Sequence, residues 1–502
     1  MKGKKNSVPF LMIVIVVSKL IGMLRDVVLA NYFGTSNVSD AYLIAASVPT
    51  LIFYFIGHSI STAYIPMYNK VKAEKDEKSA QKFSNNLLNL GLLISTVIVV
   101  FLVLVPQVAV KLFATGFDAE TAEIASSLIR ISSPSIYLMT IVSIFTGFLQ
   151  ANKSFLAPAA VSVPRNFAIV ISIVAAASFG TNYLGVGLLV AYIFEFLFLV
   201  PFVLKKHYRY SPKISFRDEN LKQTAYIILP ILLGMCVSQI NKIIDKSLAS
   251  TVVEGGISAL SYASIINSAV QEVLVTGIIT VLFASCAELV AQEKHKEVKA
   301  KLSTTINALL YLLLPASVGV IILAEPVVKV ILCRGSFDER SIALTSGALC
   351  AYTVGLCFLA VRDTLVKVFY AYKDTKTTTI TSTLAIVLKI VISFPLAKAW
   401  GINGLAIATS ISAIFNSIIL YILLKKKIGD FGTKRLFNVG VKSIISSAAM
   451  AGTILVAREP LQLLISNELI SLLFLVGLGA VVYFVMGLIL RVEPIMTVIK
   501  RK

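Results

Sequence analysis

Two short stretches of the chain place charged side chains at helical spacing within apolar sequence. The first carries Ser18, Lys19, Gly22, Arg25 and Asp26, and the second carries Ser238, Asn241, Lys242, Asp245 and Lys246. Residues three and four positions apart share one face of a helix, so each stretch predicts a single polar stripe. Four cations face only two carboxylates, which leaves a surplus of two positive charges. A cavity with surplus cations binds anions, and a diphosphate fits this pattern.

Local ion pairing is a purely structural explanation for the same charges. Arg25 could pair with a neighbouring carboxylate, and Lys242 or Lys246 could pair with Asp245. Such pairing would account for both aspartates but not for all four cations, and charged groups inside a membrane usually mark a pathway. Further ionisable groups in apolar segments remain open between structural pairs and functional groups: Arg130, Arg165, Glu195, Glu272, Arg362 and Asp363.

The composition predicts that these stripes lie inside a membrane. Hydrophobic residues make up 57% of the 502 residues and charged residues only 14%, too few to solvate a soluble protein of this size. Continuous apolar runs, each long enough to cross about 30 Å of hydrocarbon as a helix, recur along the chain and exclude the alternating pattern of a transmembrane barrel. We predict an all-α polytopic protein with about fourteen transmembrane helices, at 8–33, 42–67, 86–106, 125–149, 156–178, 184–204, 224–252, 258–286, 305–325, 343–369, 378–398, 402–424, 436–457 and 466–489.

The chain also contains an internal repeat. Residues 18–206 align with a second copy 219 or 220 positions later, so that Asp26 falls on Asp245 and Lys153 falls on Lys373. Six helices per copy predict two homologous lobes related by an axis along the membrane normal, as in transporters that are built twice. The predicted organisation is an N-terminal lobe at 1–207, a cytoplasmic linker at 208–223, a C-terminal lobe at 224–428, and two additional helices with a cytoplasmic tail at 429–502.

The net charge of +20 is concentrated on one side of this predicted topology. Nearly all loop cations lie at the N-terminus, in alternate loops and in the tail, whereas the intervening loops are short and poor in Lys and Arg. The positive-inside rule therefore predicts that both termini are cytoplasmic. This placement favours contact with anionic membrane lipids and argues against nucleic acid as a partner.

Motifs for enzymatic chemistry are missing from the sequence. It contains no nucleophile triad, no glycine-rich phosphate loop and no metal-ligand spacing, and its five cysteines form no CxxC pair. We therefore expect a transporter and not an enzyme, without a cofactor or a firmly assigned metal. Its energy would come from sodium, protons or the membrane potential.

Five segments spread along nearly the whole chain resemble a known family: SKLIGMLRDVVLANYFGTSNVSDAYLIAASVP (18–49), STAYIPMYNK (61–70), SQINKIIDKSLAS (238–250), FYAYKDTKT (369–377) and WGINGLAIATSISAIFN (400–416). The family that they resemble is MurJ (MviN). That family flips lipid II, the undecaprenyl-diphosphate-linked peptidoglycan precursor, and belongs to the multidrug/oligosaccharidyl-lipid/polysaccharide exporter superfamily. The resemblance implies transport for cell wall biogenesis in the bacterial cytoplasmic membrane, with cell-wall synthesis proteins as further expected partners.

The resemblance also assigns residues to substrate binding. Lys19 stands where the family usually has an essential arginine, Arg25 and Asp26 match its Arg-Asp pair, and Asp40 matches the aspartate before the second helix. Together with the second stripe, the expected substrate-binding set is Lys19, Arg25, Asp26, Asp40, Lys242, Asp245 and Lys246. The cations of this set would bind the diphosphate, and its aspartates would orient them.

Ion coupling and cargo are less constrained by the resemblance. Asp245 and Asp374 match two carboxylates that some members use for sodium, but Lys389 could replace a coupling sodium. Phe53 and Ile265 stand where the family commonly has arginines. These departures keep a flippase for another undecaprenyl-linked glycan (O-antigen, capsule or teichuronic-type) open beside lipid II. A cation-coupled drug exporter and a scaffold for peptidoglycan enzymes rank lower.

Overall fold

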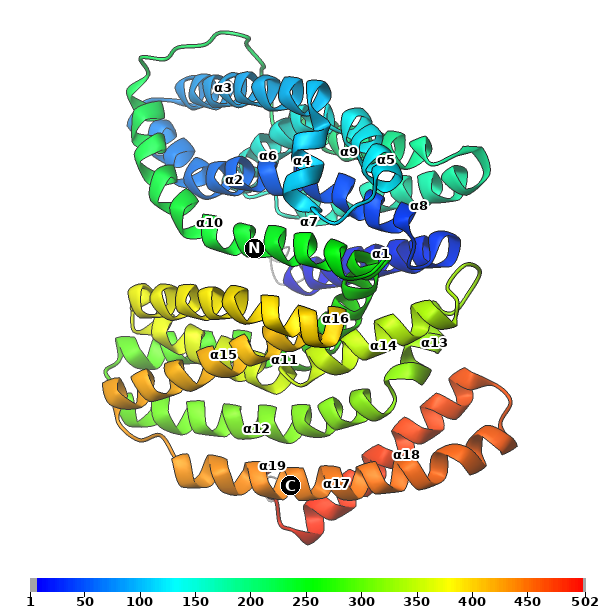
Figure 1. Cartoon of the computed structure of the whole chain (residues 1–502). Helices are drawn as coiled ribbons and strands as arrows, with labels where there is room; N and C mark the ends of the chain where they lie inside the picture. The colour runs from blue at the N-terminus through cyan, green and yellow to red at the C-terminus, as the bar shows by residue number, and fades with distance from the viewer. Residues whose placement is uncertain (1–6, 500–502) are drawn as a thin grey trace. The chain divides into compact units, whose positions relative to one another are not determined.

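The structure is a computed structural model that describes residues 7–499, and its regular structure is helical throughout this range (Figure 1). The terminal cations at positions 2, 4, 5 and 500–502 lie outside the described residues, as does the side chain of Ser238. The chain divides into two compact units, one formed by residues up to Ser258 with Arg334–Phe337, the other by Ala259–Cys333 and the residues from Asp338 onward.

The first unit holds ten helices of the described chain, and these position most of the predicted site. They are α1 (Ser7–Phe33), α2 (Asn37–Glu74), α3 (Glu77–Leu104), α4 (Pro106–Phe113), α5 (Ala119–Ser132), α6 (Ser135–Ala151), α7 (Leu156–Ala160), α8 (Ser162–Phe179), α9 (Asn182–Lys205) and α10 (Glu219–Val252). Within this unit α1 packs against α7 and α8, and α10 packs against α2. The two helices with polar stripes, α1 and α10, therefore belong to the same compact unit.

The second unit is built from the remaining helices. They are α11 (Gly256–Ala291), which begins at the boundary between the units, α12 (His295–Ile322), α13 (Ala324–Leu332), α14 (Glu339–Thr353), α15 (Leu356–Ala371), α16 (Thr375–Ile428), α17 (Thr433–Leu464), α18 (Glu468–Ile489) and α19 (Glu493–Ile499). The two additional C-terminal helices predicted at 436–457 and 466–489 correspond to α17 and α18, which pack against each other.

The helices have the length and apolarity that a membrane requires. Among the described residues, eight helices could cross a membrane, or ten if each of two bent pairs counts as one span. The bent pairs are α5 with α6 (48°) and α14 with α15 (44°). Each of the fourteen predicted spans falls largely on helix, so the all-α polytopic fold class is confirmed.

The spans predicted at 378–398 and 402–424 form one long element, α16, with a break inside it. Trp400 and Gly401 leave helical geometry there, and Gly401 takes a φ of 61°, which favours glycine. A Cβ on nearby Gly404 would lie 2.0 Å from the carbonyl oxygen of Leu396, so the two parts approach too closely for any side chain. The break thus depends on glycine at two positions.

Local backbone features recur at the offset of the internal repeat. Lys153 and its counterpart Lys373 both adopt a left-handed conformation, with φ of 59° and 57°. Asp118 and its counterpart Asp338 each cap the following helix by accepting a backbone N–H hydrogen bond, at 3.1 and 2.8 Å. The lobe boundaries at 207 and 224 stay a prediction, because the compact units divide at a different place, after Ser258.

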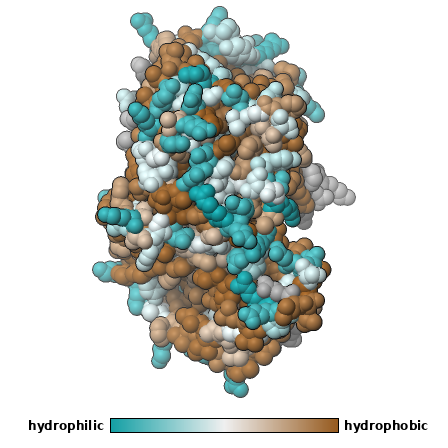
Figure 2. Space-filling model, turned by 45° about the vertical axis from the view of Figure 1, so that its right-hand side comes forward, coloured by the Kyte–Doolittle hydropathy of each residue, from teal (hydrophilic) through white to brown (hydrophobic). Residues whose placement is uncertain are grey.

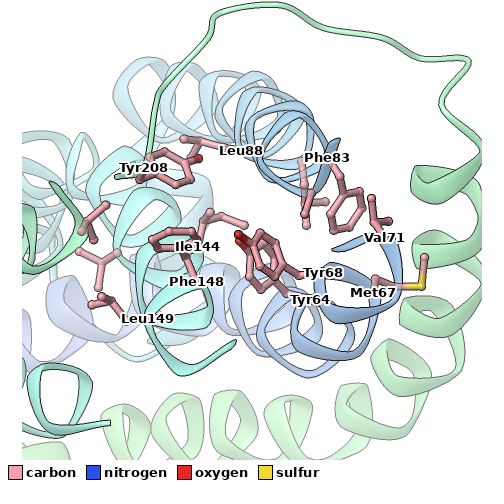
Figure 3. Close-up of a cluster of buried hydrophobic side chains, with 14 of the residues drawn as sticks. Tyr64, Met67, Tyr68, Val71, Phe83, Leu88, Ile144, Phe148, Leu149 and Tyr208 are labelled. Atoms are coloured by element: carbon pink, nitrogen blue, oxygen red, sulfur yellow. The ribbon is translucent and has the colours of Figure 1, made fainter. Parts of the chain in front are cut away.

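Aromatic side chains lock α2, α3 and α6 together in the first unit (Figure 3). The rings of Tyr64 and Tyr68 stack at 5.5 Å between centroids, and Phe148 meets Tyr68 edge-on at 5.7 Å and Tyr208 at 4.9 Å. The Tyr208 hydroxyl donates to Asn85 on α3 at 2.7 Å. The buried Tyr208 hydroxyl thus has a hydrogen-bond partner, and the packed rings exclude water.

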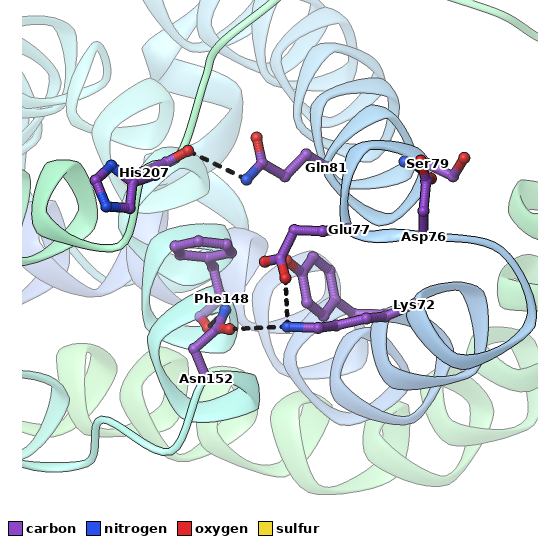
Figure 4. A network of polar contacts seen from close by, with 9 residues as sticks. Lys72, Asp76, Glu77, Ser79, Gln81, Phe148, Asn152 and His207 are labelled. Carbon is purple, nitrogen blue, oxygen red and sulfur yellow. Dashed lines mark hydrogen bonds and ion pairs between the residues drawn. The ribbon is translucent and has the colours of Figure 1, made fainter.

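The predicted linker is held along α3 by side-chain amides. Gln81 donates to the carbonyl of His207, the residue just before the linker, at 3.1 Å, and its side-chain oxygen accepts from the Arg209 N–H at 3.2 Å. Below it, Lys72 joins α2 to Glu77 on α3 and to Asn152 (Figure 4). Further along α3, three asparagines at helical spacing donate to linker carbonyls at 2.8–3.0 Å: Asn85, Asn86 and Asn89. The segment that joins the predicted lobes is therefore anchored to the first unit instead of being a free tether.

Hydrophobic residues cover much of the surface visible in Figure 2, as lipid-facing helices require. On α18, the residues Leu473, Phe474 and Val481 are each 60–61% exposed. Such an apolar surface is unfavourable in water but favourable in the hydrocarbon of a membrane. The chain is therefore a multi-pass membrane protein.

Candidate functional site

A cationic pocket of about 360 Å³ lies within the first unit, between α1 and α7–α8. Its polar lining consists of Ser18, Lys19, Arg25, Ser162, Arg165 and Asn166. Three of these residues are cations, and the described lining contains no carboxylate. Two of the predicted binding residues, Lys19 and Arg25, are thus brought together as expected from their spacing on α1. The pocket is suited to an anion.

Arg25 is held in place by groups on two helices. Its Nη2 forms an ion pair with Asp26 Oδ1 at 2.8 Å, and its Nε donates to the same oxygen at 3.0 Å. Its Nη1 donates to the Asn166 side-chain oxygen on α8 at 3.3 Å. The Asp26 side chain is only 11% exposed, whereas that of Arg25 is 30% exposed. The carboxylate therefore lies behind the guanidinium, which faces the pocket.

Arg165 repeats this arrangement on the opposite wall of the pocket. Its Nη1 lies 3.4 Å from both carboxylate oxygens of Glu195 on α9. Glu195 is buried, with 4% of its side chain exposed, while the Arg165 side chain is 30% exposed. The guanidinium also lies 5.7 Å from the centre of the Tyr192 ring, a favourable cation–π distance.

The sequence did not decide between a structural and a functional role for Arg165 and Glu195, and the predicted binding set did not include them. They lie 30 positions apart on different helices, so no spacing pattern links them. The only available signal was the presence of one cation and one carboxylate in consecutive apolar spans. Pairing between neighbouring spans needs the packing of α8 against α9, which the structure supplies.

The second stripe, on α10, contacts α2 and does not line the pocket. Lys246 donates to the Leu43 carbonyl at 3.1 Å and to the Ser47 hydroxyl. Lys242 lies 5.6 Å from the centre of the Tyr54 ring. The residues predicted as one binding set therefore form two groups within the first unit, one at the pocket and one between α2 and α10.

Asp245 and Asp40 belong to the α2–α10 group. The Asp245 carboxylate accepts a hydrogen bond from Asn241, one helical turn earlier, at 3.4 Å. Asp40 is 2% exposed and accepts backbone N–H hydrogen bonds from Ser258 at 2.7 Å and Ile257 at 3.3 Å. Asp40 thus satisfies the first N–H groups of α11, a capping role that orders the start of this helix.

The remaining predicted ion-coupling residues lie in the second unit. Asp374 caps α16 by accepting from the Thr377 N–H at 3.1 Å, and its other oxygen pairs with Lys427 at 2.5 Å. The Lys427 ammonium lowers the pKa of Asp374 below its ordinary value. Lys389 is buried within α16, at 6% exposed. Across the part of the chain that the structure describes, no three His, Cys, Asp or Glu side chains gather as metal ligands, and sodium coupling stays a prediction.

Comparison with known proteins identifies the family. Residues 29–475 match the family described as "Lipid II flippase MurJ". The chain belongs to this family. Phe53 and Ile265, where the resemblance implied arginines, are both half-buried, on α2 and α11.

MurJ relatives match along nearly their full length. A probable lipid II flippase MurJ of Thermotoga maritima is 28% identical over 487 residues, which cover 96% of both chains. The lipid II flippase MurJ of Thermosipho africanus is 29% identical over 429 residues, covering 85% of this chain and 86% of its own. Relatives named as flippases place the chain among transporters and not among enzymes, as the sequence predicted.

Solved structures show the same architecture. A lipid II flippase MurJ in an inward closed conformation superposes with a TM-score of 0.82 at 26% identity, covering 96% of this chain and 99% of that one. An inward-facing multidrug transporter of the MATE family reaches a TM-score of 0.71 at 14% identity over 82% of this chain and 95% of its own, which shows a shared fold alone.

Proposed function

We propose that this protein is a lipid II flippase, which moves the undecaprenyl-diphosphate-linked peptidoglycan precursor from the inner to the outer leaflet. The observation that carries the proposal is the pocket on α1, where Lys19 and Arg25 face an anion-sized space without a lining carboxylate. Membership of the MurJ family supports the choice of cargo. A diphosphate is the charged group that every molecule of this cargo must bring through the hydrocarbon.

The charge balance of the pocket explains why it suits this task. An isolated ion costs at least about 2.5–3.5 kcal/mol at mid-bilayer, so a diphosphate cannot cross unaided. Arg25 is already desolvated against Asp26 and fixed by Asn166, so little side-chain freedom remains to be lost when phosphate binds. Lys19, which is more exposed, supplies a second cation on the same wall of the pocket.

We further propose transport by alternating access of the two predicted six-helix lobes. Each elementary charge that moves across the membrane potential contributes about 2.3 kcal/mol per 100 mV, which makes the potential a sufficient driving force. Sodium or proton coupling through Asp245, Asp374 or Lys389 remains an alternative. The ion pair between Asp374 and Lys427 means that sodium at Asp374 would have to displace an ammonium group.

The proposed location is the bacterial cytoplasmic membrane with both termini in the cytoplasm. The lysine-rich α2–α3 turn, the linker and the α16–α17 turn would then lie on the cytoplasmic side, next to anionic lipids. Cell-wall synthesis proteins are natural further partners for a flippase of their substrate.

Complementation tests the proposal. A bacterium depleted of its own lipid II flippase should grow when it expresses this protein, and should fail to grow with Arg25→Ala or Lys19→Ala at equal membrane levels. Failure of the well-expressed wild type would instead favour another undecaprenyl-linked glycan, which shares the diphosphate. The half-buried Phe53 and Ile265 favour this second candidate, because each takes the place of a family arginine.

A further inference from the structure

The donors of the two pocket arginines are used differently. Arg25 donates hydrogen bonds to Asp26 through its Nε and Nη2 and to Asn166 through its Nη1. Arg165 contacts Glu195 through Nη1 alone among the described residues. A guanidinium binds phosphate best when two parallel N–H groups meet two oxygens, and the Nε–Nη2 edge provides such a pair. That edge is occupied on Arg25 and available on Arg165.

We propose that Arg165 is a second diphosphate-binding residue of the pocket and that Glu195 positions it, an inference that rests on the proposed transport of a diphosphate-linked lipid. Arg165 binds one phosphate by donating hydrogen bonds from its Nε–Nη2 edge, while Arg25 and Lys19 contact the other phosphate. Two guanidinium groups on facing walls match the two phosphates of a diphosphate better than they match a single phosphate. The pocket therefore selects diphosphate over monophosphate lipids.

Glu195 has a role beyond charge balance in this arrangement. Its carboxylate is buried behind Arg165, and with Tyr192 it restrains the guanidinium on the pocket wall. Asp26 is buried behind Arg25 in the same way. Both pairs place the cation toward the ligand and the carboxylate away from it, so each carboxylate reduces the cost of burying its arginine without repelling the phosphates.

Binding of inorganic pyrophosphate to the purified full-length protein in lipid nanodiscs tests the role of Arg165. The variant Arg165→Lys keeps the charge but loses the two-donor edge, and it should weaken pyrophosphate binding about tenfold while changing orthophosphate binding much less. Arg130→Lys is the matched control, because Arg130 donates to the Val103 carbonyl and does not line the pocket. Equal pyrophosphate affinity of the two variants would overturn the inference.

The variant Glu195→Gln separates positioning from simple charge balance by the sign of its effect. Removing a negative charge near the pocket strengthens anion binding if only charge matters. If Glu195 positions Arg165, the variant weakens pyrophosphate binding several-fold despite the added net positive charge. Tighter binding by Glu195→Gln would contradict the positioning role.

Chemical protection decides the same question if a variant does not fold. Phenylglyoxal modifies accessible arginines, and pyrophosphate bound to the wild-type protein should protect Arg165 but not Arg130, as peptide mass spectrometry would show. Unprotected Arg165 would overturn the inference. Failure of complementation with intact, Arg165-dependent pyrophosphate binding would refute lipid II as cargo but leave the diphosphate site standing. Full complementation by Arg165→Lys would instead support lipid II as cargo and refute Arg165 as a diphosphate-binding residue.

Discussion

Each unit contains an arginine that pairs with the aspartate directly after it in the sequence, and the two ion pairs differ in which charge is exposed. Arg25 pairs with Asp26 at 2.8 Å, and Arg362 on α15 pairs with Asp363 at 2.6 Å. The two arginine side chains are almost equally exposed, at 30% and 32%, but the aspartates are not: Asp26 is 11% exposed and Asp363 is 35% exposed. The first pair therefore presents a cation, and the second presents both ends of a dipole.

The neighbouring helix causes this difference. Asn166 on α8 accepts a hydrogen bond from Arg25, whereas Gln271 on α11 donates a hydrogen bond to Asp363 at 3.1 Å. In the first unit the packing supports the cation, and in the second unit it supports the carboxylate. Adjacent charges in a sequence thus acquire a role only through the third residue that packs against them.

The largest contrast should come from removing each arginine. Arg25→Ala takes away a proposed phosphate contact and leaves Asp26 buried without its partner, which costs about 3–5 kcal/mol. We expect transport to fall by at least about 100-fold. Arg362→Ala leaves Asp363 hydrogen-bonded to Gln271 and partly solvated, so most transport should remain. Growth rescue at matched membrane levels measures both, and equal losses would refute the contrast.

Removal of each carboxylate should separate the pairs by stability. Asp26→Asn replaces a buried charge that faces Arg25, and we expect the free energy of unfolding to fall by about 3 kcal/mol. Asp363→Asn affects a partly exposed pair and should cost about 1 kcal/mol or less. Thermal unfolding of the purified variants in the same detergent gives this comparison. A larger loss for Asp363→Asn would contradict the stronger burial of Asp26.

The supporting amides should have smaller effects, and on different properties. Asn166→Ala removes a hydrogen bond to a charged group, worth about 1.5–3 kcal/mol, and should weaken pyrophosphate affinity about tenfold because Arg25 loses its orientation. Gln271→Ala should leave that affinity unchanged, because it supports a carboxylate in the other unit. Titration of both variants with pyrophosphate decides between them. An equal loss of affinity would assign both amides to general stability.

The smallest effect is expected at an ion pair outside the spans, between Asp374 and Lys427. The pKa of Asp374 is lowered by Lys427, so this pair stabilises the fold above the ordinary aspartate pKa of about 3.9, and the contribution disappears as pH falls through the lower native value. Asp374→Asn should therefore reduce stability by less than about 1 kcal/mol at pH 7, and this loss should shrink as the pH falls below about 3.9. Unfolding measured from pH 7 downward tests the sign, and a loss that grows as the pH falls would contradict it.

The helical spans and the stripe on α1 could be predicted because apolar length and a spacing of three to four residues are local properties. The partners of the stripe could not. Lys242 and Lys246 share the pattern of Lys19 and Arg25, yet they contact Tyr54 and Ser47 on α2 and do not line the pocket. Arg165 joins the pocket through the packing of α1 against α8, which no spacing encodes. Periodicity indicates which face is polar, and packing decides what that face meets.

Transport of fluorescent lipid II in proteoliposomes tests whether this protein moves the lipid through its cationic pocket. We expect liposomes with the wild-type protein to move lipid II between leaflets well above the rate of protein-free liposomes. We also expect Arg25→Ala to abolish this movement and Arg362→Ala to preserve it. A wild-type rate equal to that of protein-free liposomes, or equal rates for the two variants, would contradict transport through the cationic pocket.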